Sequence, residues 1–172
     1  MLSSRSLYRG RVINLRVDEV ETSLGRQITR EVVEHDGCVV IMALDDERQV
    51  LLVRQFRYPA GQSLLEVPAG GLNVGEAEEE GARRELREET GYLPRQLKRL
   101  GGFFACPGYS TEYQHLYLAQ DLEHRPLVAE DTEDIELVRV ELTQVPRLIA
   151  SGEIQDAKSI AGLFMALRHL GL

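Results

Sequence analysis

The sequence has few of the features that mark disulfide-rich, membrane or exported proteins. Cys38 and Cys106 are its only cysteines, too few for a disulfide framework and without metal-site spacing. No run approaches the ~18 apolar residues that a membrane span requires, so no membrane partner is expected. The first ten residues lack the apolar core of a signal peptide, so the expected location is cytoplasmic.

Positive charge is also in short supply. The chain has 20 Lys and Arg residues against 28 Asp and Glu, a net charge of -8 at pH 7 and a pI near 5.1. Such a balance disfavours non-specific binding to DNA or RNA, so no nucleic-acid partner is expected. A nucleotide substrate stays compatible with this charge, because a bound metal ion can invert the local field.

The N-terminal residues have the loose apolar and polar alternation of half-buried antiparallel strands. We expect strands over Leu7–Ile13, Leu15–Val20 and Gln27–Val33. This piece is too small to hold a core alone, so it must pack on the rest of the chain, on a second subunit, or on both. We therefore divide the chain into residues 1–36 and residues 37–172.

The remainder predicts a mixed sheet flanked by helices, which is an α/β architecture. Cys38–Leu44 is a continuous apolar run, typical of a strand buried on both faces, and Val50–Arg57 is its expected hairpin partner. Further strands are expected at Leu64–Val67, Leu97–Phe104, Gln114–Ala119 and Ile135–Val140, and helices after Glu76, from Thr143 to Gly152, and after the capping residue Asp156.

An acidic helix, expected to begin just after Glu76 and to end at Gly91, carries the main chemical signal. Glu85, Glu88 and Glu89 stand at positions i, i+3 and i+4, so they share one helical face. Like charges at i and i+4 cost a few tenths of a kcal/mol on a bare helix. A hard divalent cation would offset that repulsion, because carboxylate oxygens are the ligands that Mg2+ takes.

The stretch Gly70–Tyr92 resembles the Nudix box, G-x5-E-x7-R-E-U-x-E-E-x-G-U, in which U is a bulky apolar residue. Tyr92 at the last position is the single departure, and it is still large and mostly apolar. The resemblance implies a Nudix-type α/β/α sandwich with a mixed sheet and an N-terminal antiparallel β appendage. The matching positions are Gly70, Glu76, Arg84, Glu85, Leu86, Glu88, Glu89 and Gly91.

The resemblance also implies roles for individual residues. Glu85 and Glu89 match the metal-binding glutamates of the box, and Glu88 is a shared ligand or helps to position water. Arg84 matches the residue that orients the glutamates, and the carbonyl of Ala69 resembles a further metal ligand. Mg2+ is the expected cofactor, with Mn2+ as an alternative, and water is the expected nucleophile.

The residues that flank the box resemble those of the ADP-ribose pyrophosphatase subgroup. These are Val53–Arg57, Leu65–Gly70 and Pro107 in the loop that begins at Cys106. Such enzymes cleave ADP-ribose to AMP and ribose 5-phosphate. The resemblance therefore predicts a nucleoside diphosphate sugar as the small-molecule substrate.

Substrate contacts follow from the same resemblance. Arg57 resembles an arginine that holds the diphosphate, and Arg30 resembles a contact from the N-terminal strands. Glu112 matches a ribose-contacting glutamate. Arg54 is a further candidate, and for all three arginines a surface salt bridge is the alternative.

The catalytic base and the assembly are also implied by the resemblance. The acidic stretch Asp121–Asp134 resembles the loop that supplies the base, and we nominate Glu133, with Asp131 as second choice. The subgroup forms dimers that exchange their N-terminal strands. Residues 1–36 are therefore the expected dimerisation element, and residues 37–172 are the expected Nudix hydrolase domain of a homodimer.

Three alternatives stay open from the sequence. The nearest is a related pyrophosphatase acting on another nucleotide sugar, such as GDP-mannose. A different class is a non-catalytic ADP-ribose-sensing Nudix module, which the intact charged positions of the box disfavour. The third is isomerase chemistry on an isoprenoid diphosphate, which would require a catalytic pair such as Cys106 and Glu112.

Overall fold

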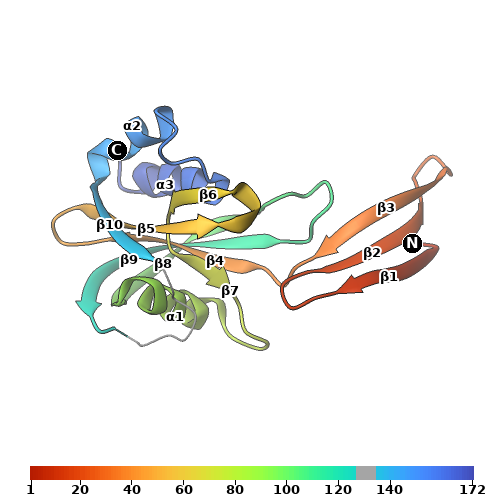
Figure 1. The fold of residues 1–172 in the computed structure, drawn as a ribbon, viewed down its shortest axis with the longest axis horizontal. Coiled ribbons are helices and arrows are strands. Elements are labelled where there is room, and N and C mark those ends of the chain that lie inside the picture. The colour runs from red at the N-terminus through yellow and green to blue at the C-terminus, as the bar shows by residue number, and fades with distance from the viewer. Residues whose placement is uncertain (127–134) are drawn as a thin grey trace. The chain divides into compact units, whose positions relative to one another are not determined.

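The computed structural model describes residues 1–126 and 135–172 (Figure 1). Within these residues, a seven-stranded sheet carries three α-helices, and a separate antiparallel sheet of three strands forms at the N-terminus. The expected α/β class, with its mixed sheet and N-terminal antiparallel strands, is therefore confirmed.

The chain separates into two compact units. The first contains Met1–Gly37 together with Phe103–Gln114, and the second contains Cys38–Gly102 together with His115–Leu172. The N-terminal strands therefore share their unit with a loop that lies far away in the sequence.

The N-terminal sheet is built from β1 (Ser3–Arg9), β2 (Asn14–Glu21) and β3 (Gln27–Glu34) in that order. The strand predicted over Leu7–Ile13 has the wrong bounds: β1 ends at Arg9, and the turn between β1 and β2 occupies the rest of that range. The amide of Gly10 donates to the carbonyl of Ile13 and reverses the chain there. Every residue of β1 is exposed, so this sheet has little core of its own.

The large sheet has the order β10-β5-β4-β9-β8, with β6 paired to β5 and β7 paired to β4. All seven residues of β4 are buried, which confirms the prediction made from its unbroken apolar run. The strands are β4 (Cys38–Leu44), β5 (Gln49–Arg57), β6 (Gln62–Glu66), β7 (Ala69–Gly71), β8 (Tyr92–Phe104), β9 (Tyr113–His124) and β10 (Glu136–Glu141).

Helices cover both faces of this sheet. Helix α1 (Glu78–Thr90) lies on one side, and α2 (Val145–Ala150) and α3 (Ala157–His169) lie on the other, as Figure 1 shows. This is the expected α/β/α layering. Two short 3-10 turns, Tyr58–Ala60 and Leu142–Gln144, complete the regular structure described. None of the helices in the described ranges is long and apolar enough to cross a membrane.

The ends of two helices are as predicted. Gly91 follows α1 with a φ of 77°, the left-handed conformation that glycine adopts most readily. Asp156 caps α3 by accepting a hydrogen bond from the amide of Ser159. On α3, Leu163 and Leu167 are buried, whereas the apolar side chain of Phe164 is 48% exposed. It lies ~100° around the helix from Leu163, which is enough to leave the buried stripe.

Packing places α1 on the sheet. Ala82 and Leu86, one turn apart on α1, are fully buried against Ile41 of β4 and Leu51 of β5. Leu86 fills the bulky apolar position of the box. Because this apolar face points toward the sheet, the glutamates on the other faces of α1 are left near the helix surface and the adjoining β7.

Candidate active site

The first glycine of the box gives β7 room to lie against α1. A Cβ added to Gly70 would lie 2.1 Å from Cδ of Glu85, far inside any normal contact. The carboxyl group of Glu85 therefore occupies the space that a side chain at residue 70 would need. This contact is the physical reason for a glycine at this position, 15 residues ahead of the glutamate.

Arg84 organises the acids of the box. Its Nε and Nη2 each lie 2.8 Å from an oxygen of Glu76, and Nη2 also donates to the carbonyl of Gly71 at 2.9 Å. Its Nη1 lies 2.6 Å from Oε1 of Glu85 and 3.1 Å from Oε2 of Glu88. The guanidinium thus holds three carboxylates, and its contact with Glu88 is the i,i+4 ion pair that the helical spacing favours.

The spacing along α1 also favours i,i+4 pairs of Glu79 with Arg83 and of Glu80 with Arg84, but longer-range contacts replace both. Arg84 turns back to Glu76, eight residues earlier, in place of Glu80. Arg83 donates to the carbonyl of Pro94 in β8, in place of a pair with Glu79. Both arginines therefore fasten α1 to neighbouring segments, which an isolated helix cannot reveal.

The two ends of this arrangement differ in acidity. Hydrogen bonds from Arg84 lower the pKa of Glu76 to about 2, so Glu76 stays ionised. Burial raises the pKa of Glu85, although Arg84 opposes the shift. Burial, followed by repulsion from Glu85, raises the pKa of Glu89 to about 8. The amide of Ala69 donates to Oε2 of Glu89 at 3.1 Å.

We call Arg84, Glu76, Glu85, Glu88 and Glu89 the box cluster. It sets four carboxyl groups against one guanidinium, so ionisation of all four leaves a surplus of negative charge. Among the residues that the structure describes, no three His, Cys, Asp or Glu side chains are grouped closely enough to chelate a metal as they lie. Oxygens of Glu85 and Glu88 contact Arg84 instead.

The box cluster nevertheless fits a hard divalent cation by its donor chemistry. Glu85 and Glu89 are desolvated carboxyl groups with raised pKa values, and neutralisation by a cation would remove the cost of ionising them. Carboxylates with a nearby backbone carbonyl, such as that of Ala69, are the oxygen ligands that Mg2+ and Mn2+ take.

Arg57 lies close to this site through a second group of charges. Its Nε donates to Oε2 of Glu66 at 2.7 Å, and Nζ of Lys158 donates to Oε1 of the same carboxylate at 2.7 Å. Both cations lower the pKa of Glu89, which burial and Glu85 raise, so both lie within electrostatic reach of it. We call Arg57, Glu66, Lys158 and Asp156 the Lys158 cluster.

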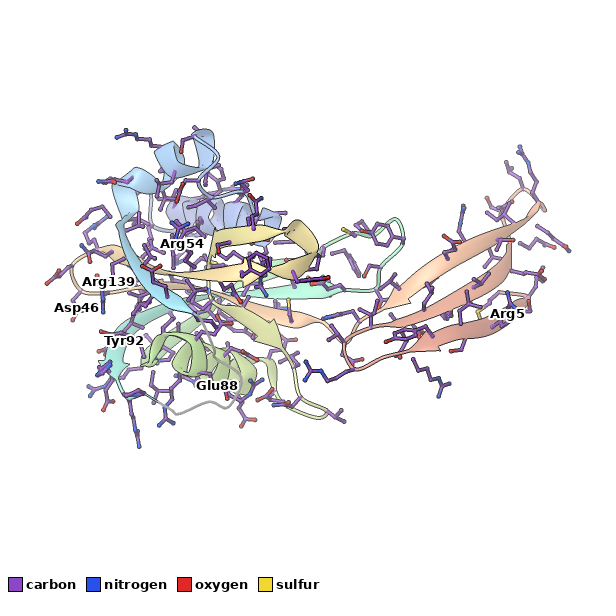
Figure 2. All side chains as sticks on the ribbon, in the orientation of Figure 1. Arg5, Asp46, Arg54, Glu88, Tyr92 and Arg139 are labelled. Atoms are coloured by element: carbon purple, nitrogen blue, oxygen red, sulfur yellow. The ribbon has the colours of Figure 1, made fainter. Side chains whose placement is uncertain are left out.

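Arg54 is placed differently from Arg57. The two residues are three positions apart on β5, and side chains alternate between the faces of a strand, so they point to opposite faces. Nη2 of Arg54 lies 2.7 Å from Oε1 of Glu153. Figure 2 shows Arg54 on the side of the sheet that carries α2 and α3, whereas Glu88 projects from α1 on the other side. The structure therefore does not bring Arg54 together with the box cluster.

Arg30 and Glu112 belong to the first compact unit, whereas the box cluster belongs to the second. Arg30 lies exposed on β3, and Oε1 of Glu112 accepts a hydrogen bond from Nε2 of Gln114 at 2.9 Å. Their substrate contacts stay predictions. Glu133 and Asp131 lie outside the described residues, so the choice of base also stays a prediction.

Sequence reasoning missed Glu66 and Lys158 as parts of the site. A usable signal existed for Glu66, because a single acid in the apolar run Leu64–Val67 must be buried with a partner or break the run. Lys158 carried no such signal. It stands in the first turn of a helix, where a lysine is usually solvated, and only the fold turns it toward Glu66.

Two families of known proteins match adjoining parts of the chain. The family described as NUDIX domain matches residues 34–163. The family described as nucleoside diphosphate sugar hydrolase N-terminal domain matches residues 1–33. The first match covers most of the chain and contains the whole box.

Similar proteins extend over nearly the full length. ADP-ribose pyrophosphatase of Bacillus subtilis is 38% identical over 162 residues, covering 92% of this chain and 86% of the relative. Methanol dehydrogenase activator of Bacillus methanolicus is 35% identical, covering 99% and 91%. GDP-mannose pyrophosphatase of Yersinia enterocolitica is 34% identical, covering 89% and 84%.

One solved structure supports the fold independently. A crystal structure of an ADP compounds hydrolase aligns with a TM-score of 0.89, covering 99% of this chain and 92% of the other at 24% identity. With the family match and the intact box, the assignment is complete. The chain belongs to the Nudix family and is a Nudix pyrophosphohydrolase.

Proposed function

We propose that this enzyme hydrolyses the diphosphate bond of ADP-ribose to AMP and ribose 5-phosphate. A water oxygen forms the new bond to phosphorus, the bridging P–O bond breaks, and the departing phosphate oxygen keeps the bonding electron pair. The observation that carries the proposal is the box cluster, whose half-buried Glu85 and Glu89 have raised pKa values, with the accessible Arg57 within electrostatic reach of Glu89. The ADP-ribose pyrophosphatase from Bacillus subtilis supports the choice of substrate.

A bound Mg2+, or Mn2+ in its place, would polarise the diphosphate and lower the pKa of the attacking water. Glu85, Glu88, Glu89 and the carbonyl of Ala69 would hold it. Arg84 keeps Glu85 and Glu88 in position through the contacts described. Arg57, with 38% of its side chain exposed, binds the diphosphate oxygens.

The remaining roles belong to the same proposal. Arg30 and Glu112 contact the nucleoside and ribose portions of the substrate. Arg54 is the weakest candidate, because the structure pairs it with Glu153. Glu133 removes a proton from the attacking water, with Asp131 as the alternative base.

We also propose a homodimer that exchanges its N-terminal strands, with residues 1–36 as the dimerisation element and residues 37–172 as the catalytic domain. Support comes from the solvent exposure of β1, where Leu7 and Tyr8 are 49% and 57% exposed. Apolar side chains on a sheet with little core of its own are typical of a surface covered by a partner. The expected cytoplasmic location stays a prediction.

The test is phosphate release from ADP-ribose, GDP-mannose and NADH, coupled to a phosphatase, with and without Mg2+. Mg2+-dependent cleavage of ADP-ribose in preference to the other two supports the proposal. Preference for GDP-mannose, the substrate in the name of the Yersinia relative, would leave the proposed chemistry unchanged and replace the proposed substrate. Binding of ADP-ribose without turnover of any of the three would contradict the proposal and support a sensor.

The choice of base has its own test. Glu133→Gln is expected to slow turnover more than it weakens ADP-ribose binding, because a general base contributes ~100-fold or more to rate without contacting the rest of the substrate. Asp131→Asn is the matched variant. A larger fall in turnover for Asp131→Asn would show that Asp131 is the base.

A further inference from the structure

Glu66 is a buried carboxylate held between two cations. Its side chain is 3% exposed and receives Nε of Arg57 on one oxygen and Nζ of Lys158 on the other, each at 2.7 Å. A carboxylate buried to this extent needs full compensation by hydrogen bonds and charge. Here the two partners divide that task, one oxygen each.

Lys158 is fixed by more than Glu66. Its Nζ also lies 2.8 Å from Oδ2 of Asp156, and only 11% of its side chain is exposed. The same Oδ2 accepts hydrogen bonds from the amide and the hydroxyl of Ser159 at 3.0 and 2.6 Å. The hydroxyl of Ser159 accepts one from the amide of Val67 at 2.9 Å. The start of α3 is thereby fastened to the segment that leads from Glu66 to the box.

The charges of the Lys158 cluster are balanced. Arg57 and Lys158 supply two cations, and Glu66 and Asp156 supply two anions. If the guanidinium of Arg57 also binds a substrate, Glu66 still has the ammonium group of Lys158 at 2.7 Å. Lys158 can therefore still compensate the buried carboxylate of Glu66 when Arg57 is engaged elsewhere.

Arg57 uses only one edge of its guanidinium for Glu66. Over residues 1–126 and 135–172, the guanidinium of Arg57 makes one hydrogen bond, from Nε to Glu66. A guanidinium carries five N–H groups in a planar fork, and the two terminal nitrogens are suited to paired phosphate oxygens. A buried carboxylate without a second cation would instead draw the fork into a two-point contact, because that geometry compensates both of its oxygens.

We propose that Lys158 is a positioning residue, which neutralises Glu66 so that Arg57 is held through Nε alone and offers its terminal nitrogens to the substrate diphosphate. The inference rests on the proposed function in assigning the diphosphate to Arg57. It adds that α3, on the opposite face of the sheet from α1, controls the availability of that arginine.

The first experiment measures kcat and KM for ADP-ribose in four variants with Mg2+ present. Lys158→Met is expected to raise KM by ~10-fold, equivalent to ~1.4 kcal/mol, with kcat changed by less than ~3-fold, because Glu66 then occupies the fork of Arg57. Lys158→Arg restores a low KM. The chain has one other lysine, the exposed Lys98, and Lys98→Met is the matched control that leaves KM unchanged.

The double variant Glu66→Gln/Lys158→Met separates positioning from simple support of the fold. Removal of the carboxylate frees Arg57 again, so KM in the double variant is expected to fall below that of Lys158→Met. If Lys158 only supports the fold, two buried lesions add, and KM stays as high or rises further. That result, or an unchanged KM in Lys158→Met, would overturn the proposal. Should Lys158→Met not fold, Lys158→Gln replaces it, since an amide donates to Glu66 without charge.

A second measurement does not depend on turnover. Binding of inorganic diphosphate to the metal-free protein is followed by calorimetry in the same variants, with the same order of affinities expected. If the wild-type protein cleaves no diphosphate ester, the proposed function fails, and this binding series still decides the role of Lys158. Equal affinities in wild-type and Lys158→Met protein would reject it.

Discussion

The box cluster and the Lys158 cluster handle charge in opposite ways. In the box cluster, four carboxyl groups share one guanidinium, which contacts three of them, and burial raises the pKa values of Glu85 and Glu89. In the Lys158 cluster, two cations face two carboxylates, and Lys158 donates hydrogen bonds to both of these carboxylates. The first arrangement has an excess of acidic groups, whereas the charges of the second are balanced. In the proposed function, the first would bind the divalent cation, and the second would position side chains near it.

The largest effect is expected when one carboxylate of the box cluster is removed. Glu89→Gln should lower Mg2+-dependent turnover of ADP-ribose by at least ~100-fold, because the electrostatic stabilisation supplied through a metal ligand acts on the transition state. Circular dichroism and thermal melting of the same protein check that the fold is intact. Unchanged turnover with Mg2+ would show that Glu89 holds no metal.

A substitution that keeps the positive charge of Arg84 but removes its hydrogen-bonding geometry should have a smaller effect. Arg84→Lys retains one positive charge but cannot reproduce the four carboxylate contacts and the bond to the carbonyl of Gly71. Turnover is expected to fall by ~10- to 100-fold, as it does when groups that orient metal ligands are removed. Steady-state kinetics over a range of Mg2+ concentrations measure it. Turnover equal to wild type would mean that charge, and not geometry, is what Arg84 contributes.

Binding of Mg2+ should stabilise the fold through the box cluster alone. At a Mg2+ concentration 100 times its dissociation constant, binding to the native state adds ~2.7 kcal/mol to the free energy of unfolding. Thermal melting with and without Mg2+ is expected to show this gain in wild-type protein and in Asp156→Asn, but not in Glu85→Gln/Glu89→Gln. A gain of equal size in the double variant would place the ion elsewhere.

The smallest effect concerns the balanced cluster. Burial opposes ionisation of Asp156, but Lys158 and Ser159 outweigh it and lower its pKa below the ordinary value of 3.8. A lowered pKa adds stability at pH values above 3.8, and this contribution is lost as the pH falls through the native pKa. Asp156→Asn should therefore cost about 1–2 kcal/mol near pH 7 and progressively less below pH 4.

Urea unfolding of wild-type protein and Asp156→Asn at pH 7, 5 and 3 measures this difference. A cost that is independent of pH would show that the capping geometry, and not the charge, accounts for the contribution of Asp156. A cost that grows toward acid pH would contradict the direction of the pKa shift.

The reach of sequence reasoning differed between these two clusters for a physical reason. The box cluster lies on one helix, so the spacing of Glu85, Glu88 and Glu89 already places them on one face. The partners of the Lys158 cluster come from β5, β6 and the start of α3, which are up to 101 residues apart from Arg57 to Lys158. No local periodicity links such positions. Arg54 and Arg57 are a different case: the resemblance grouped them, although the alternation along β5, which is itself a local pattern, sends them to opposite faces.

Local patterns were sufficient wherever a single element was concerned. The apolar run of β4, the left-handed turn at Gly91, the cap at Asp156 and the acids of the box all follow from short stretches of sequence, because backbone conformation and amphipathic faces depend on neighbouring residues. Only the tertiary structure decided that Arg84 turns to Glu76, that Glu85 fills the space beside Gly70, and that Lys158 reaches Glu66. Those contacts depend on how strands and helices pack, and packing joins residues that the chain keeps far apart.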